Sequence, residues 1–538
     1  MCLKVHSPWP MPEDTAAVCQ PLLPENNPYR LIGERLFDQF SEQAYADLYA
    51  PEGKPAVSPV ILAFVTVFQF LEKLTDRPAA EGVRVRLDWK YALHLPLSYA
   101  GFDFSVLSEF RQRLLTHEAE GRVFETLVQA FRAQGLIKSR GVQRTDSVAI
   151  LTKVRDLSRL ELVVETLRLA VQAMVKAAPD WSQRELPPSW EARYAPRFIL
   201  QRHTETEKQD YEARIGAEGQ WLLNRLAQLD TPEAVRDLPA VQVLRTVWQQ
   251  HFQAVNGQIR YTPTGHYDGH TQIQTPHDPD ARYSRKRGFA WIGGKVQVTE
   301  TDDVDYPHLI TDIQATCSAD TDYRALPAVQ DRLHQRECLP AQQYVDSAYV
   351  SGPNLVASGQ KEIDLVGPVP TVISHQTKLP EGITTEQFVI DVASQQATCP
   401  VGLCVSSYGG RPGKLRFRFP KDLCLACALH DRCCMGQGGR TVTVSPSYPL
   451  LQEARRRQTT DTFKQAYRHH RSGVEGCLSA LVRGQGLRLS RYIGHRKRQL
   501  QALFTGAAAN VKRAARWLAG DRPRRYHRPW NLVPAPTG

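Results

Sequence analysis

The order of hydrophobic patterns along the chain places the strongest constraint on its fold. Residues 141–151 alternate in the manner of a half-buried strand, with Arg144 and Asp146 on the same face. Comparable strand signals return only at 291–299 and 308–316, and the long segment between them carries mainly helical spacing. A strand is therefore separated from its neighbours in the sheet by a large helical insertion.

A helix and two further strand-like runs follow. Leu326, Val329 and Leu333 have the 3,4 spacing of a helix, 343–347 reads as a strand, and 363–369 supplies a fifth candidate. This order is the one that a ribonuclease H-like core gives when a helical domain is inserted after its first strand. The sequence therefore predicts an α/β fold built on such a core.

A chain of 538 residues should divide into three or four folded units. We expect a helical N-terminal domain at 1–139, the core at 140–155, 265–369 and 448–520, a helical insertion at 156–264, a cysteine-rich insertion at 370–447 and a basic tail at 521–538.

The N-terminal domain contains two clear helix signals. Pro59 begins an apolar run that is too short to span a bilayer, which indicates a buried helix. Ser105 is a plausible N-cap for a second helix, with Arg111 and Arg113 expected on its basic side. Such a unit suits DNA binding, and a helical oligomerisation module fits the same pattern.

Charge favours a polyanionic partner. The chain has 67 Lys and Arg against 56 Asp and Glu, a formal net charge of +11. A merely soluble basic protein is the alternative. Residues 1–20 lack the pattern of a signal peptide, so we expect a cytoplasmic protein with no membrane association and with reduced thiols.

Three acids are candidates for metal binding. Asp146 lies within a predicted strand, Asp346 at the end of another, and Glu475 on a helix where Tyr467, Arg471 and Glu475 recur every four residues. Mg²⁺ prefers hard oxygen ligands and retains waters, so two or three carboxylates can hold it. Two such ions are a common means of phosphoryl transfer on DNA. For any three acids chosen in isolation, solvated surface groups are the more common outcome.

The C-terminal region is strongly basic. Between Arg483 and Arg528 there are thirteen Lys or Arg and one acid, Asp521, and aromatic residues are interleaved with them. An apolar stripe from Leu500 to Leu518 indicates a helix that packs on the core, and the basic residues would then face DNA phosphates. Our candidates for DNA contacts are Arg471, Arg483, Arg488, Arg491, Arg496, Lys497 and Arg498, together with a patch at Arg282, Arg285, Lys286 and Arg287. A solvated cationic face is the alternative.

Six of the eleven cysteines lie between 399 and 434. Cys424, Cys427 and Cys433 form a C-x₂-C-x₅-C pattern, and Cys399 is an upstream fourth candidate. Four thiolates suit a closed, structural zinc site. Small buried residues with an accidental CxxC are the alternative.

Several phrases of the chain resemble the DDE transposases of bacterial insertion sequences. They are QRTDS followed by VRDLSRLELVVETLR, then HDPDARYSRKRGFAWIGGKVQVTET, YVDSAYV, and YRHHRSGVEG followed by GLRLSRYIGHRKRQLQ. The resemblance covers roughly residues 25–520 in the same order. It implies a catalytic core whose metal-binding triad is Asp146, Asp346 and Glu475, and it favours Cys399, Cys424, Cys427 and Cys433 as zinc ligands, with Cys404 and Cys434 as substitutes.

By that resemblance the protein is a Mg²⁺-dependent transposase with two metal ions and a structural zinc. It would act as a homodimer or higher oligomer on double-stranded DNA, both at the element ends and at the target. The chain departs from the family pattern at Val148-Ala149, Gly293-Gly294 and Ala348. These departures motivate the alternative of a catalytically inactive, sequence-specific DNA-binding protein derived from a transposase. A plain nuclease is a third possibility.

Overall fold

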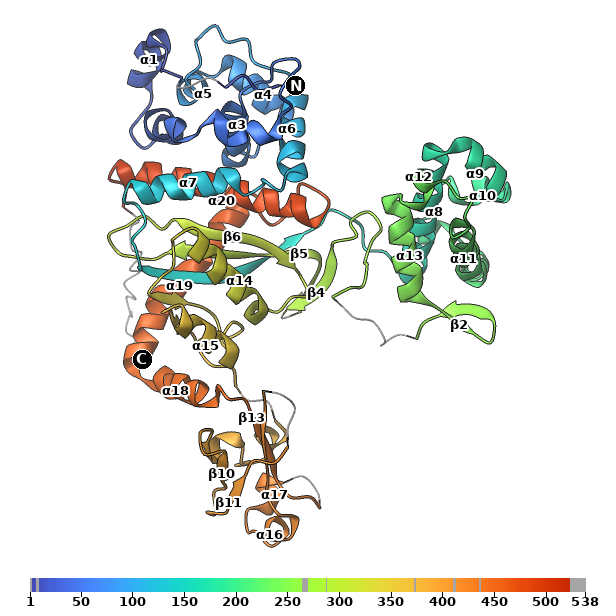
Figure 1. Cartoon of the computed structure of the whole chain (residues 1–538), viewed down its shortest axis with the longest axis vertical. Coiled ribbons are helices and arrows are strands. Elements are labelled where there is room, and N and C mark those ends of the chain that lie inside the picture. Colours follow the sequence, from blue (N-terminus) through green and yellow to red (C-terminus); the bar gives the residue numbers. More distant parts are fainter. Residues whose placement is uncertain are drawn as a thin grey trace, which may run out of the picture. The chain divides into compact units, whose positions relative to one another are not determined.

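The computed structural model describes residues 2–5, 9–263, 270–286, 288–371, 374–409, 413–434 and 437–522 (Figure 1). The chain divides into two compact units. Unit 1 comprises 1–138, 303–310 and 503–538, and unit 2 comprises 139–302 and 311–502. We expected residues up to 520 to lie in the core, whereas the second half of helix α20 (His495–Leu518) clusters with unit 1.

Unit 1 is helical. Its helices include α1 (Glu13–Cys19), α2 (Pro28–Leu31), α3 (Pro59–Glu72), α4 (Asp76–Val85), α5 (Leu87–Ala92), α6 (Ser105–Thr116) and α7 (Arg122–Ala133). The expected buried helix is confirmed: α3 begins at Pro59, and its residues from Pro59 to Phe70 are all buried. Across the described part of the chain, no helix combines the length and apolarity needed to cross a membrane.

Helix α6 differs from expectation in two details. Ser105 is its first helical residue rather than its cap, and Asp103 Oδ1 accepts a hydrogen bond from the Ser105 N–H at 2.9 Å. Arg111 does not lie on an exposed basic side. It is 8% exposed and pairs with Asp76 at 2.7 Å, because a buried guanidinium needs a nearby carboxylate.

Unit 2 contains a six-stranded mixed sheet in the order β4-β5-β1-β7-β8, with β6 paired to β5. Its strands are β1 (Val142–Leu151), β4 (Arg282–Lys286), β5 (Phe289–Thr301), β6 (Ile310–Cys317), β7 (Gln342–Tyr344) and β8 (Asp364–Val366). β1 is antiparallel to β5 and parallel to β7, and β7 is parallel to β8. The five strands predicted from alternation are confirmed, and β4 was missed.

The helices that accompany the sheet include α14 (Asp322–Gln335), α15 (Gly352–Gln360), α18 (Tyr448–Thr459) and α19 (Asp461–Gly484), and the first turns of α20 bond β6 through Gln499. The helix predicted from Leu326 is α14. α19 packs against β1 and β7, so a helix from the end of the chain contacts the two central strands.

The segment after β1 is helical, as its spacing predicted. It contains α8 (Arg159–Ala177), α9 (Pro179–Glu185), α10 (Ser189–Tyr194), α11 (Glu205–Leu226), α12 (Glu233–Arg236), α13 (Pro239–His251) and a hairpin of β2 (Phe252–Val255) and β3 (Gln258–Tyr261). Ser158 and Thr204 close the N-termini of α8 and α11 with capping boxes. These elements share a hydrophobic core of their own.

The cysteine-rich segment forms small sheets with a separate core. Its elements are β9 (Val389–Asp391), β10 (Gln396–Thr398), β11 (Cys404–Ser406), β12 (Leu415–Arg418), α16 (Lys421–Leu425), α17 (His430–Cys433) and β13 (Thr441–Val444).

Candidate active site

Asp146 lies in the central strand of the sheet and is only 7% exposed. Its Oδ1 accepts a hydrogen bond from the Ser147 N–H at 2.8 Å, and its Oδ2 accepts one from Arg471 Nη2 at 2.6 Å. Arg471 comes from α19, so a cation carried by the helix contacts an acid carried by the sheet.

Asp346 follows β7 by two residues. Arg144 of β1 is paired with Tyr344 of β7 in parallel register, and two residues further along the strands this register leads to Asp146 and Asp346. The two carboxylates also interact electrostatically. β7 ends at Tyr344 whereas β1 continues to Leu151, so the chain that carries Asp346 leaves the sheet beside the part of β1 that carries Asp146.

The electrostatics of Asp146 reflect its burial. Burial raises the pKa of its carboxyl group, the Arg471 guanidinium and the Ser147 N–H oppose that effect, and the charge of Asp346 adds to it. The net pKa stays above the ordinary value. The neighbouring positive charge and hydrogen bonds therefore do not fully offset the cost of burying the ionised Asp146 carboxylate. A further positive charge would stabilise it.

Helix α19 is fixed to the sheet by a buried ion-pair network. Arg144 is 5% exposed and donates to Glu300 and to Asp302, each at 2.7 Å. His470 of α19 bonds Asp302 through Nδ1 at 2.6 Å, and its backbone carbonyl accepts from Arg144 at 3.1 Å. The network places Arg471 beside Asp146.

Gly473 explains how closely α19 approaches the sheet. A Cβ built at this position would lie 1.9 Å from Arg144 Nη1. Arg144 belongs to the same strand face as Asp146, which the alternation shows, but its partners are more than 150 residues away in sequence. Sequence reasoning therefore missed the network.

Glu475 lies one turn after Arg471 on α19 and is exposed. It lines a groove that also includes Ser147, the residue after Asp146. Among the residues that the structure describes, no three His, Cys, Asp or Glu side chains come close enough together to hold one metal ion. The structure thus associates Asp146 with Asp346 and places Glu475 nearby, without gathering all three.

Tyr467, two turns before Glu475, stacks on Phe463 with ring centroids 5.6 Å apart. Burial raises the pKa of its hydroxyl group. It therefore packs against a cluster formed by Tyr344, Val366 and Phe463.

The basic candidates fall into two groups. Arg483, Arg496 and Lys497 are exposed, and Arg488 and Arg491 are half-buried. Arg498 is 1% exposed and forms an ion pair with the fully buried Asp278 at 2.6 Å. Our expectation that Arg498 contacts DNA is wrong in this conformation, because its guanidinium is enclosed and neutralised.

The second basic patch is divided as well. Arg282 donates to the backbone carbonyls of His270 and Ala281 and so supports local structure. Lys286 is exposed, whereas Arg287 lies outside the described residues.

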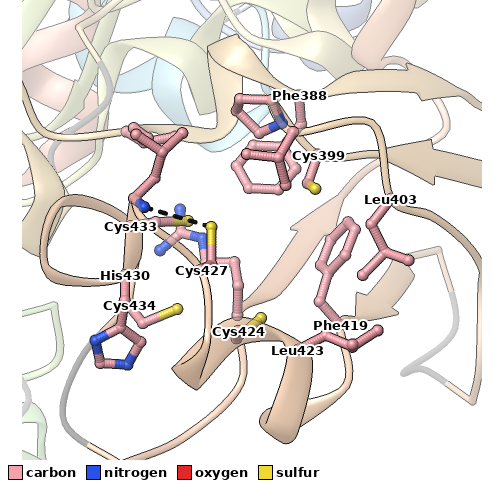
Figure 2. A pocket seen from close by; sticks show the side chains of 15 residues that line it. Phe388, Cys399, Leu403, Phe419, Leu423, Cys424, Cys427, His430, Cys433 and Cys434 are labelled. Carbon is pink, nitrogen blue, oxygen red and sulfur yellow. Dashed lines mark hydrogen bonds between the residues drawn. The ribbon is translucent and has the colours of Figure 1, made fainter.

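The cysteine-rich segment has a pocket of its own (Figure 2). All four predicted ligands line it: Cys399 from the loop after β10, and Cys424, Cys427 and Cys433 from α16, α17 and their connection. Cys434 also lines the pocket, as does His430, which sequence reasoning passed over although it stands midway between Cys427 and Cys433. As placed, these side chains do not form a metal-holding group among the described residues.

Two protein-family models match the chain. A transposase DDE domain matches residues 398–515, a range that includes Glu475 and the basic segment through Lys512 and Arg513. A transposase domain (DUF772) matches residues 17–113, most of the N-terminal helical unit. Both matches support an insertion-sequence DDE transposase. Neither a curated protein nor a solved structure matches it significantly.

These matches indicate the broad character of the protein. The family acts on DNA and uses divalent metal ions, typically Mg²⁺. The DDE match covers Glu475 but begins after Asp146 and Asp346, so the assignment of those two acids depends on their geometry in the sheet.

Proposed function

We propose that the transposase catalyses metal-dependent cleavage and strand transfer at the ends of an insertion sequence, with Asp146, Asp346 and Glu475 as its metal-binding residues. Water attacks the phosphate at each end, and the freed 3′-OH then attacks target DNA. The observation that carries the proposal is the β1–β7 register, which leads to Asp146 within β1 and to Asp346 just beyond the end of β7. Two bound divalent ions would supply activation of the attacking oxygen and stabilisation of the leaving one.

The residues present fit such ions in kind. Asp146 and Asp346 offer hard oxygen donors, and Mg²⁺ keeps several waters, so two carboxylates provide an adequate anchor. The Arg471 guanidinium already places positive charge against Asp146. We assign Glu475 as the third acid because it lies one turn beyond Arg471 and lines the groove that contains Ser147.

The remaining groups would hold DNA. Arg483, Arg488, Arg491, Arg496 and Lys497 lie at the end of α19, in the following loop and at the start of α20, and we assign them to phosphates of the backbone. Arg471 would contact the phosphate nearest the acids. The Arg144 network keeps these groups in place by fixing α19 to β1.

We assign the sheet of unit 2 to a ribonuclease H-like core, a proposal supported by the strand order β6-β5-β1-β7-β8 and by the antiparallel pairing of β5 with β1. The N-terminal helices would bind element ends, and the active assembly would be a dimer or larger oligomer on DNA.

We also propose a structural zinc ion in the cysteine-rich pocket. Cys399, Cys424, Cys427 and Cys433 are soft donors lining one small cavity, which fits zinc in kind. The thiols would have to move closer together, and metal binding commonly drives such movement by coupling to local folding.

The departures from the family pattern leave the three proposed acids intact. Ala348 does bond Asp346, but it does so through its backbone N–H, which donates to Asp346 Oδ1 at 2.8 Å and which a glycine would supply equally. Gly294 has no room for a side chain, because a Cβ there would lie 2.9 Å from the Thr316 carbonyl oxygen. Val148 and Ala149 line the groove beside Glu475 without altering Asp146. We therefore favour an active enzyme over an inactive DNA-binding derivative.

Replacing Asp346 with Asn tests the proposal. Loss of a direct ligand should reduce Mg²⁺-dependent cleavage of an end-containing duplex by more than the roughly 100-fold that loss of a supporting residue can cause. DNA binding, measured by mobility shift without metal, should persist. Asp331→Asn is the control, since its carboxylate is 61% exposed on α14. Undiminished cleavage by Asp346→Asn would reject the assignment.

A further inference from the structure

A groove beside the proposed acids has an apolar floor. The groove lies between α19 and the β4–β5 hairpin, and Val148, Trp291, Leu478 and Val482 contribute apolar atoms to it. Leu478 and Val482 are one turn apart on α19, and Glu475 precedes Leu478 by three residues, so the same helix face continues from the acid into the groove. A surface that binds only phosphates has no need of such a floor.

An exposed aromatic ring stands at the hairpin end of this groove. Phe289 is 49% exposed and stacks on Trp291, with ring centroids 5.7 Å apart and an interplanar angle of 18°. Trp291 is only 6% exposed, and its indole N–H donates to the Gly294 carbonyl. The buried indole therefore holds the Phe289 ring in a fixed orientation, with about half of its surface left open.

The rim of the groove is cationic. Lys286 lies opposite Phe289 in the β4–β5 register, and directly opposed residues of an antiparallel pair project from the same sheet face. Lys295, Arg483 and Arg488 also line the groove, whereas Glu475 is the one acid among the lining residues described. Lys295 is paired with Asp322 at 3.5 Å, and the other three cations still outnumber the one carboxylate, which favours a polyanion.

An open aromatic ring between cations matches the chemistry of single-stranded nucleic acid. Bases stack on aromatic side chains while the backbone follows positive charge, and every base offers a π-face. In a duplex, neighbouring bases already cover those faces. Apart from the outer face of a terminal base pair, Phe289 can therefore stack only on a base that is unpaired.

We infer that this groove binds unpaired nucleotides of the DNA end, with one base stacked on Phe289 and the adjoining phosphates held by Lys286 and Arg488. The inference rests on the proposed function, because it places these nucleotides beside the phosphate that Asp146 and Asp346 act upon. Phe289 is a positioning residue in this scheme. It distinguishes frayed or single-stranded ends from intact duplex.

Phe289→Ala tests the inference in the full-length protein. The probe is a DNA end with a short single-stranded extension that carries 2-aminopurine, whose fluorescence is quenched by stacking, in metal-free buffer. Loss of one stacking contact should weaken binding of the extended end about tenfold and reduce the quenching. Affinity for a blunt duplex should change less than twofold. Phe289→Trp should restore both binding and quenching, because it restores a stacking surface.

Tyr283→Ala is the matched control. Tyr283 is 47% exposed on the same hairpin but lies opposite Ile292, on the face away from Phe289. It should leave binding and quenching unchanged. Equal loss in both variants, or no loss in Phe289→Ala, would overturn the inference.

If Asp346→Asn abolishes cleavage while Phe289→Ala binds normally, the proposed function stands and the groove assignment fails. If Asp346→Asn cleaves normally, the proposed function itself fails.

Discussion

Arg144 is the residue through which the sheet should control the position of α19. Its guanidinium is 5% exposed and bonds two carboxylates that are themselves buried, Glu300 at 1% and Asp302 at 7% exposure. Arg144→Met keeps the aliphatic volume but leaves both acids without this cation. Removing one partner of a buried pair costs about 3–5 kcal/mol, because the remaining charge is uncompensated.

A surface pair of similar length provides the comparison. Arg456 and Glu453 are 2.6 Å apart on α18, with side chains 76% and 65% exposed. Such exposed pairs contribute about 0–1 kcal/mol, since water solvates each charge separately. Arg456→Met should therefore be nearly silent, although its bond length resembles those of Arg144. The difference in stability between the two variants therefore comes from the burial of the ion pair and not from its length.

Hydrogen exchange measured by mass spectrometry is the appropriate assay, because a chain with two compact units has no single unfolding free energy. A local loss of 3–5 kcal/mol should speed exchange of amides in α19 and β1 by about 100- to 4,000-fold. Arg456→Met should change exchange in α18 by less than about tenfold. Similar changes in both variants, or an Arg144→Met effect below tenfold, would refute the argument that the network fixes α19.

Two further predictions concern the insertions. Cys427→Ser should lower zinc content from about one ion per chain and increase proteolysis within 370–447, whereas Cys404→Ser should change neither, because Cys404 does not line the pocket. Metal analysis showing no zinc in the wild type would remove that claim. Glu165 is the second case: burial would raise the pKa of its carboxyl group, but hydrogen bonds from His277 and Arg168 outweigh it and lower the pKa to about 2. This lowered pKa stabilises the fold above about pH 4.5, and the benefit is lost as pH falls toward 2. Glu165→Gln should therefore cost about 3 kcal/mol at neutral pH, measured by hydrogen exchange in α8, and almost nothing near pH 2.

Local pattern predicted the elements of this fold better than it predicted their long-range partners. The strand at 142–151 and the helix beginning at Pro59 follow from periodicity and from the conformational preference of proline, both of which act within a few residues. The hairpin strand β4 escaped prediction because Arg282, Arg285 and Lys286 read as a solvated basic patch.

Charged residues show the same division. Arg111 and Arg498 belong to basic runs, which indicate a surface, yet both are buried against acids far away in sequence. Asp278 precedes Arg498 by 220 residues, so the sequence around Arg498 gives no indication of this ion pair. Periodicity predicts which face of a helix or strand is buried. It does not predict which distant acid will neutralise a buried arginine, because that pairing depends on the tertiary structure.

Asp146 and Glu165 show how the structure distinguishes two kinds of buried acid. Both are nearly inaccessible, at 7% and 3% exposure, and each receives an arginine hydrogen bond. The pKa of Glu165 is lowered, because His277 and Arg168 outweigh its burial. The pKa of Asp146 remains raised, because its burial outweighs Arg471 and the Ser147 N–H, and the negative charge of Asp346 adds to that effect. When hydrogen bonds and ion pairs fully offset the cost of burying a carboxylate, as at Glu165, a role in stability is enough to explain that residue. The uncompensated burial of Asp146 beside a second acid agrees with the proposed metal site, because a divalent cation offsets two adjoining negative charges more completely than one guanidinium can.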